Sequence, residues 1–134
     1  EPLSGYLILG QKLLQENSLV KNQSFNFGPP ARVNQSVGDL ISELAQYWQG
    51  AECSFEQDLD SGKPESKLLK LNCDKAIQML NWNSVLDFSE TVRMTGEWYQ
   101  AFYNKTSSSI AETTSKQIES YTKLATQSNL AWTK

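Results

Sequence analysis

The stretch Leu68–Asn104, LLKLNCDKAIQMLNWNSVLDFSETVRMTGEWYQAFYN, decides the fold class that we predict for this chain. Its first residues, within Lys67–Leu71, have the composition of a short strand. Asn72 is a residue type that caps helices, and the helix that it opens is expected to run through Leu80. The Asn-Trp-Asn that follows breaks this helix, and the capping pattern DFSE at Asp87–Glu90 opens another.

Apolar and aromatic residues in the second of these helices recur at spacings of 4, 3, 4 and 3, which is typical of a face turned toward a core. The residues at these spacings are Phe88, Val92, Thr95, Tyr99 and Phe102. The overlapping aromatic cluster of Trp98, Tyr99, Phe102 and Tyr103 could instead stack on nucleic-acid bases. In a chain with a net charge of −3, a place in the core is the better interpretation.

Toward the N-terminus, Leu3–Gln15 predicts a helix with Pro2 in its first turn, where proline is tolerated. Apolar residues surround nearly the whole helix: Leu3, Tyr6, Leu7, Ile8, Leu9, Leu13 and Leu14. A helix that is apolar on all sides is buried on all sides. We therefore expect either the central core helix or a helix with one face meant for a neighbour outside this chain.

Three further segments complete the prediction. The alternation in Ser24–Gly28 (SFNFG) predicts a second short strand, which Pro29 and Pro30 stop. A capping-box pattern at Ser36–Asp39 opens a helix that Gly50 closes. A last helix is expected at about residues 111–127.

The expected fold is therefore α+β, with about five helices and two short strands in one domain of 134 residues. Residues 1–104 would form its core, residues 105–110 a linker, and residues 111–134 a C-terminal helix and tail. Strands this few and short do not make a self-sufficient sheet. They need a neighbour, either each other or a sheet supplied from outside.

The residues for several kinds of chemistry are missing from this sequence. It contains no histidine, which excludes Ser-His-Asp and Cys-His catalysis and every histidine metal ligand. It also lacks the glycine-rich turns that hold dinucleotides or nucleotide phosphates. Glu56, Asp58 and Asp60 alternate in a polar loop, but the glycine and glutamate that a calcium loop needs do not fall into place. We expect a solvated acidic loop and no metal site.

Charge and cysteine content restrict the partners and the compartment. The twelve Lys and Arg residues are scattered, which disfavours binding to nucleic acid, and no apolar run approaches the roughly 20 residues that span a bilayer. Cys53 and Cys73 have no CxxC partner. A disulfide is possible by count, but two such cysteines are more typical of free thiols in a reducing cytosol. We therefore expect a cytoplasmic protein that binds neither nucleic acid nor membrane.

Several motifs, in order along the chain, resemble the C-terminal part of extended short-chain dehydrogenase/reductases that act on nucleotide sugars. The family patterns D-x-S-K-A, L-G-W-x-P and T-x-x-W-Y appear as Asn72–Ala76, Leu80–Ser84 and Thr95–Tyr99. Two further pieces, EPLSGYLILGQKLL at Glu1–Leu14 and SFNFGPP at Ser24–Pro30, look like the CDP-glucose 4,6-dehydratases of this NAD-dependent epimerase/dehydratase family, as does the tail SKQIESYTKLA.

The resemblance implies a substrate-binding lobe. The parent enzyme, a lyase of polysaccharide biosynthesis, would use bound NAD to oxidise C4 of CDP-glucose, eliminate water across C5–C6 and return the hydride to C6. The NAD and the catalytic Thr, Tyr and Lys groups belong to the N-terminal Rossmann domain of the family. This chain would hold no catalytic or cofactor-binding residue, would supply one wall of the nucleotide-sugar site, and would be inactive without that domain as its partner.

Four residues are candidates for contacts with the sugar nucleotide: Tyr6, Asn26, Pro64 and Glu65. Pro64 and Glu65 align with a His-Glu-Ala motif of the family, so proline stands where the family has histidine. That change implies either an altered substrate or a fragment that is no longer under functional constraint. For Tyr6 and Asn26 the alternatives are ordinary packing and strand solvation.

A second hypothesis is a free-standing interaction module derived from this lobe. The apolar first helix would then be an interface with a partner or with a second copy, and a homodimer is expected, for example by exchange of the short strands. A third hypothesis, a small nucleic-acid binder, is disfavoured by the charge.

Overall fold

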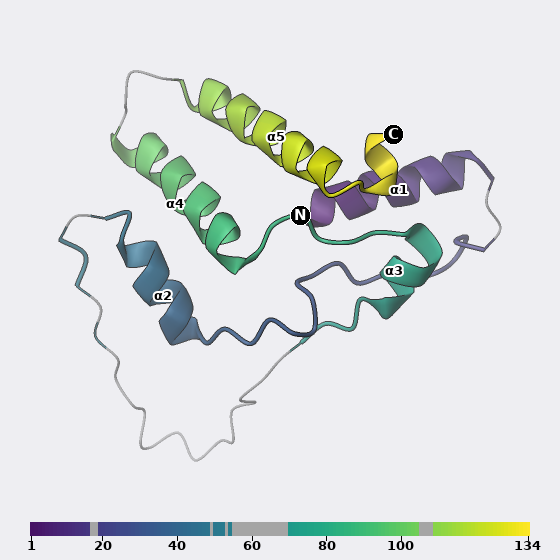
Figure 1. Ribbon diagram of the computed structural model, residues 1–134, viewed down its shortest axis with the longest axis horizontal. Coiled ribbons are helices and arrows are strands. Elements are labelled where there is room, and N and C mark those ends of the chain that lie inside the picture. The colour runs from purple at the N-terminus through teal and green to yellow at the C-terminus, as the bar shows by residue number, and fades with distance from the viewer. Residues whose placement is uncertain (17–18, 49, 53, 55–69, 105–108) are drawn as a thin grey trace, which may run out of the picture.

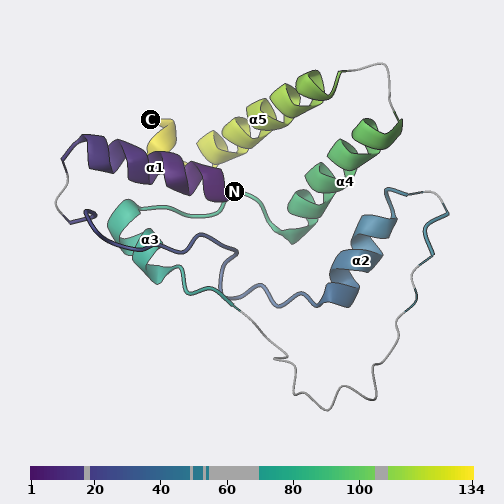
Figure 2. The same ribbon diagram turned by 180° about the vertical axis from the view of Figure 1, so that it is seen from behind.

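The computed structural model describes residues 1–16, 19–48, 50–52, 54, 70–104 and 109–134. These residues form five α-helices and a short 3₁₀ helix: α1 (Pro2–Leu14), α2 (Val37–Ala45), α3 (Asp74–Leu80), α4 (Phe88–Asn104), α5 (Ile110–Gln127) and η1 (Ala131–Thr133). Figures 1 and 2 show α4 between α2 and α5, with α1, α3 and η1 gathered at the other end of the molecule.

The predicted helices are confirmed within a few residues at their ends, because local signals define them. Ser36 and Asp39 form the predicted capping box: the Ser36 hydroxyl accepts the Asp39 N–H at 3.1 Å, and the Asp39 carboxylate accepts the Ser36 N–H at 2.8 Å. The helix ends at Ala45, earlier than expected, and i→i+3 hydrogen bonds continue the chain toward Gly50. Gly50 has a left-handed φ of +79°, the backbone conformation that commonly follows the end of a helix.

The predicted α+β class is wrong, since the described part of the chain is helical and contains no strand. Ser24–Gly28 is an extended segment without ladder partners. Of the second predicted strand, residues 67–69 lie outside the described residues, and Lys70 and Leu71 are not in a strand. The two segments do lie side by side: the Asn26 amide donates to the Asn72 carbonyl at 3.1 Å.

Side-chain packing takes the place of a ladder between these segments. A Cβ on Gly28 would lie 3.3 Å from Cδ1 of Leu71, so the Leu71 side chain packs closely on the Gly28 backbone. Pro29 and Pro30 follow at once, and proline has no N–H to donate to a neighbouring strand. Two such short segments cannot form an independent sheet.

The main core lies where α1, α3 and the extended segment meet. Phe27 is its centre, with its ring edge-on to Trp82 at 5.1 Å and to Tyr6 at 5.3 Å. Gly5 of α1 lies directly against the Phe27 ring. The buried members of this cluster are Ile8, Val20, Phe27, Cys73, Ala76, Leu80 and Trp82.

The predicted inward seam of α4 is only partly right. Val92 is buried, but Thr95, Tyr99 and Phe102 are exposed, and Met94 and Gly96 are buried instead. The reason is that α4 packs against two helices on different sides. One side meets Tyr47 near α2, whose ring covers Gly96, and the other side meets α5.

The aromatic cluster at the end of α4 is largely exposed, and the expectation that it lies in the core is wrong. Trp98 stacks on Phe102, and Tyr99 stacks on Tyr103, each pair one helical turn apart. The Trp98 indole donates to the Thr114 hydroxyl of α5 at 2.9 Å, which ties this cluster to the neighbouring helix at one point.

A polar cluster joins the start of α1 to α5 and to the segment after α3. The Glu1 carboxylate accepts the backbone N–H groups of Val85 and Leu86 at 3.0 and 2.6 Å. The Ser4 hydroxyl accepts the Trp82 indole N–H at 2.9 Å. The Tyr121 hydroxyl lies 3.1 Å from both the Glu1 carboxylate and the Ser4 hydroxyl. Burial raises the pKa of Tyr121 to about 12, and the nearby Glu1 charge acts in the same direction.

Helix α1 is not a central core helix, which removes the first of the two alternatives for it. Gly5 and Ile8 are buried, whereas the Leu3, Leu7 and Leu14 side chains are 72%, 75% and 87% exposed. The chain therefore covers one side of α1 and leaves the opposite apolar side bare.

Replacement of Gly5 by alanine is expected to lower the free energy of unfolding by about 2 kcal/mol, because overpacking a core has a cost of this order. The added Cβ would lie 2.3 Å from Cδ1 of Phe27 and must displace the ring. Gly10→Ala on the same helix is the control, since a Cβ there meets no atom within 4 Å. Urea unfolding monitored by circular dichroism measures the free energy of unfolding of both variants. Equal effects would contradict the packing of Gly5 on Phe27.

Tyr121 is expected to make stability fall at alkaline pH. Its pKa is about 12 in the fold against 10.0 for a free tyrosine, so its stabilising effect is present below pH 10 and is lost between these two values. Tyr121→Phe should cost about 1 kcal/mol at neutral pH through its lost hydrogen bond, and should reduce the fall above pH 10. Thermal unfolding across this alkaline pH range tests the role of Tyr121, with Tyr103→Phe on α4 as the control. An unchanged alkaline fall in Tyr121→Phe would refute the assignment.

Candidate functional site

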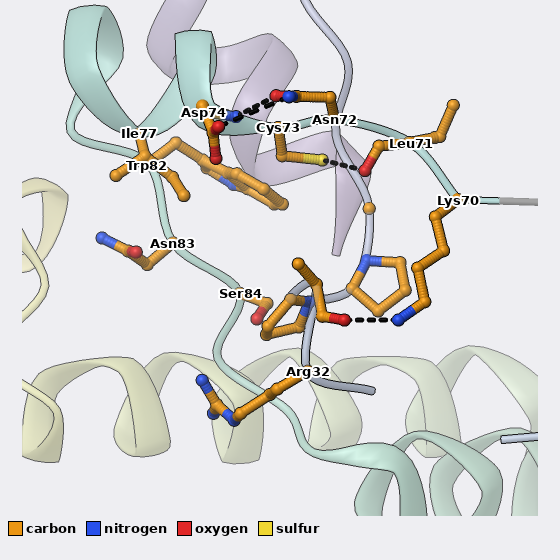
Figure 3. Close-up of a pocket in the computed structure, with 14 residues that line it drawn as sticks. Arg32, Lys70, Leu71, Asn72, Cys73, Asp74, Ile77, Trp82, Asn83 and Ser84 are labelled. Atoms are coloured by element: carbon orange, nitrogen blue, oxygen red, sulfur yellow. Dashed lines mark hydrogen bonds between the residues drawn. The ribbon is translucent and has the colours of Figure 1, made fainter. Parts of the chain in front are cut away.

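A cavity of about 580 Å³ lies where the turn after the extended segment meets the residues on both sides of α3. Its size is within the range of roughly 300–1,000 Å³ that small-molecule sites have. In the view of Figure 3, Asn72, Cys73 and Asp74 lie at one end of it, Arg32 at the other and Lys70 at the side. The lining residues are Gly28, Pro29, Pro30, Ala31, Arg32, Lys70, Leu71, Asn72, Cys73, Asp74, Ile77, Trp82, Asn83 and Ser84.

The wall around Asn72 is held by hydrogen bonds at the start of α3. The Asn72 side-chain oxygen accepts the Asp74 N–H at 2.9 Å, so Asn72 supplies the predicted cap, although Cys73 is the residue directly before the helix. The Asn72 carbonyl accepts from Asn26, as described above. Two segments far apart in the sequence are thereby fixed to each other at one end of the cavity.

The floor of the cavity is formed by buried side chains. Trp82 is almost completely buried, and Cys73 is a buried free thiol. Trp82 follows Asn81, which has a left-handed φ of 54° at the end of α3. Asparagine adopts this conformation more readily than other residues with a side chain, so Asn81 ends α3 with a sharp turn of the chain directly before the buried Trp82.

Two of the three charged residues that line the cavity are basic. Lys70 donates a hydrogen bond to the Ala31 carbonyl, so its ammonium bridges the two walls. Arg32 is exposed, and within the described ranges no ion pair engages its guanidinium. Asp74 is the single acidic residue of the lining. The cavity is therefore better suited to an anion than to a cation.

The predicted site residues are only partly brought together here. Asn26 adjoins the cavity through its bond to Asn72 but does not line it. Tyr6 packs edge-on against Phe27 and does not line the cavity either. Pro64 and Glu65 lie outside the described residues. The prediction missed Arg32 and Lys70, which no motif links, although a basic residue after a Gly-Pro-Pro turn was a usable signal.

A second cavity of about 690 Å³ is a mostly apolar groove between α1, α4 and α5. Leu3, Leu7, Trp98 and Ile118 are among its apolar lining residues, and Gln11, Gln117 and Tyr121 provide polar groups. Glu1 lies in this groove, but its carboxylate is already engaged by Val85, Leu86 and Tyr121, as above. The groove thus favours an apolar surface over a charged ligand.

The described residues contain no cluster of acidic or cysteine side chains that could hold a metal ion. Their helices are also too short or too polar to cross a membrane. The acidic residues Glu56, Asp58 and Asp60 fall outside the ranges that the structure describes.

Comparison with known proteins agrees with the motifs. No family model and no solved structure matches the chain. A CDP-glucose 4,6-dehydratase of Salmonella typhimurium (strain LT2) is 30% identical to it over 102 residues, which are 76% of the chain and 28% of that enzyme. The chain therefore spans little more than a quarter of the relative's length. Over three quarters of its own length it is similar to CDP-glucose 4,6-dehydratase, and the resemblance predicted from its motifs is confirmed.

Proposed function

We propose that the chain is the nucleotide-sugar-binding lobe of a protein related to CDP-glucose 4,6-dehydratase, and that the cavity beside α3 receives the diphosphate of the nucleotide. The observation that carries this proposal is the pair of basic side chains, Arg32 and Lys70, on a cavity of ligand size. Guanidinium and ammonium groups are the usual partners of phosphate oxygens.

The remaining lining fits the other parts of such a ligand. Cys73, Ile77 and Trp82 give an apolar surface, and Asn83 and Ser84 add neutral hydrogen-bonding groups of the kind that hold sugar hydroxyls. Tyr6, Asn26, Pro64 and Glu65 remain proposed contacts from the family resemblance. Of these, Asn26 acts through Asn72, whose carbonyl it holds.

Dehydratase chemistry needs groups that this sequence does not contain. It has no glycine-rich turn that fits NAD, so we assign NAD and the catalytic residues to a separate Rossmann domain. The chain alone is then a binding lobe without turnover, and its setting is the cytoplasm, where the substrates of nucleotide-sugar enzymes are found.

The second candidate function is an interaction module. The bare apolar side of α1 favours it, because an apolar surface of this kind commonly marks an interface. The two functions use different parts of the molecule and can be tested separately.

An NMR titration of the 134-residue chain with CDP-glucose tests the proposed site, with amide chemical-shift changes as the measure of binding. Arg32→Gln should weaken binding about tenfold, because a hydrogen bond to a charged group is lost. Lys70→Gln should act in the same direction. Lys123→Gln on the exposed side of α5 is the matched control and should leave the affinity unchanged.

CDP should compete with CDP-glucose in this experiment, whereas free glucose should not, since the basic pair recognises the phosphates. Higher salt should weaken binding, because exposed charges are screened. Equal loss of affinity in Arg32→Gln and Lys123→Gln, or shifts confined to residues away from α3, would contradict the assignment.

A further inference from the structure

The acidic residue of the cavity, Asp74, is not placed where a phosphate would lie. Figure 3 shows Asp74 beside Asn72 at one end of the cavity and Arg32 at the other end. A carboxylate repels a phosphate but accepts hydrogen bonds from neutral donors. The cavity therefore distinguishes the two ends of its occupant, with an anionic part near Arg32 and a hydrogen-bond donor near Asp74.

Hydrogen bonds hold the Asp74 carboxylate in place without using all of its capacity. The Asn72 side-chain amide donates to Oδ2 of Asp74 at 3.3 Å, and the Asn72 side-chain oxygen accepts the Asp74 N–H at 2.9 Å. Asn72 is itself fixed, because its carbonyl accepts from Asn26. No donor among the described residues engages Oδ1, and an ionised carboxylate has room for about four hydrogen bonds. Asp74 thus offers an oriented acceptor to a ligand.

Apolar surface lies next to this carboxylate. Ile77 follows Asp74 by three residues, so the two side chains are neighbours on one side of α3, and both line the cavity. Leu71 lines it as well, and Leu71 and Ile77 are both exposed enough to contact a ligand. A flat ring with apolar faces and a hydrogen-bonding edge fits this combination. A sugar fits it less well, because hydroxyl groups surround its ring.

We propose that Asp74 recognises the nucleobase of the ligand and selects cytosine, which carries an exocyclic amine, over uracil. The inference rests on the proposed function, which places the diphosphate at Arg32 and Lys70. The 4-amino group of cytosine donates hydrogen bonds, and acidic side chains accept them from cytosine in protein–DNA complexes.

Uracil lacks the donor that this carboxylate needs. It has a carbonyl oxygen in place of the 4-amino group, and the lone pairs of that oxygen face those of the carboxylate. Its ring N–H lies between two carbonyl oxygens, so a carboxylate that approaches this N–H meets repulsion from both sides. The free Oδ1 of Asp74 therefore favours cytosine in two ways, by attraction to the amine and by repulsion of the carbonyl.

The ordinary alternative is that Asp74 only stabilises α3, since acidic residues are favourable in the first turn of a helix. A stabilising role of this kind changes the free energy of unfolding but treats all nucleotides alike. The ratio of the affinities for two nucleotides that differ in the base therefore separates the two roles.

NMR titrations of the 134-residue chain with CDP and with UDP test the selection, because these ligands differ only in the base. The unchanged chain should bind CDP at least about tenfold more tightly, which is the effect of one hydrogen bond to a charged group. Asp74→Asn should reduce this ratio to about threefold or less, since an amide both donates and accepts. Asp74→Ser should reduce it too, because a hydroxyl also does both.

Two controls accompany these variants. Asp39→Asn makes the same change in the first turn of α2, away from the cavity, and should leave the ratio unchanged. Arg32→Gln should weaken CDP and UDP alike, because both carry the same diphosphate. Circular dichroism verifies that each variant is folded.

The outcomes separate this inference from the proposed function. Equal binding of CDP and UDP to the unchanged chain, with both weakened by Arg32→Gln, would overturn the role of Asp74 and leave the phosphate site standing. An Asp74→Asn variant that keeps the preference for CDP but loses affinity for CDP-glucose would also overturn it, and would place the glucose at Asp74. Absence of binding by either nucleotide would overturn both proposals.

Discussion

The contact of Phe27 with Gly5 and Trp82 is the constraint on which the rest of the structure depends. The Phe27 ring lies against the bare backbone of Gly5 and meets the indole of Trp82 edge-on. One side chain thus fixes α1, the extended segment and the residues after α3 to one another. Because Phe27 is next to Gly28, the same contact sets Gly28 against Leu71 and Cys73 and so determines the distance between the two walls of the cavity.

Local signals in the sequence predicted the helices but not which sides of them are buried. Ser36, Asp39 and Asn81 act within a few residues of the chain, so their patterns were sufficient to place helix ends. The seam of α4 could not be predicted in the same way, because α2 and α5 contact this helix on different sides. The periodicity of one helix carries no information about how many neighbours it has.

The error in fold class has a similar origin. The alternation in Ser24–Gly28 predicted a strand, but it could not show whether the backbone finds ladder partners. The sequence could not predict the candidate cavity for the same reason, since Arg32 and Lys70 line one cavity only because their two segments lie side by side. Asn26, which lies beside the cavity, was a candidate contact from the family resemblance, and no pattern in the sequence predicted its bond to Asn72.

The proposed ligand site depends on one side of α1, and the bare apolar side of this helix lies opposite. Gly5, on the inner side, supports Phe27 and through it the wall of the cavity, whereas Leu7 and Gly10 belong to the outer side. Side chains on the outer side can therefore change without moving the Phe27 ring. Effects of mutations at sites that share no partner are usually additive. A substitution on the bare side of α1 would then leave ligand binding intact, and an α1 substitution that impaired binding would have to act through Gly5 and Phe27.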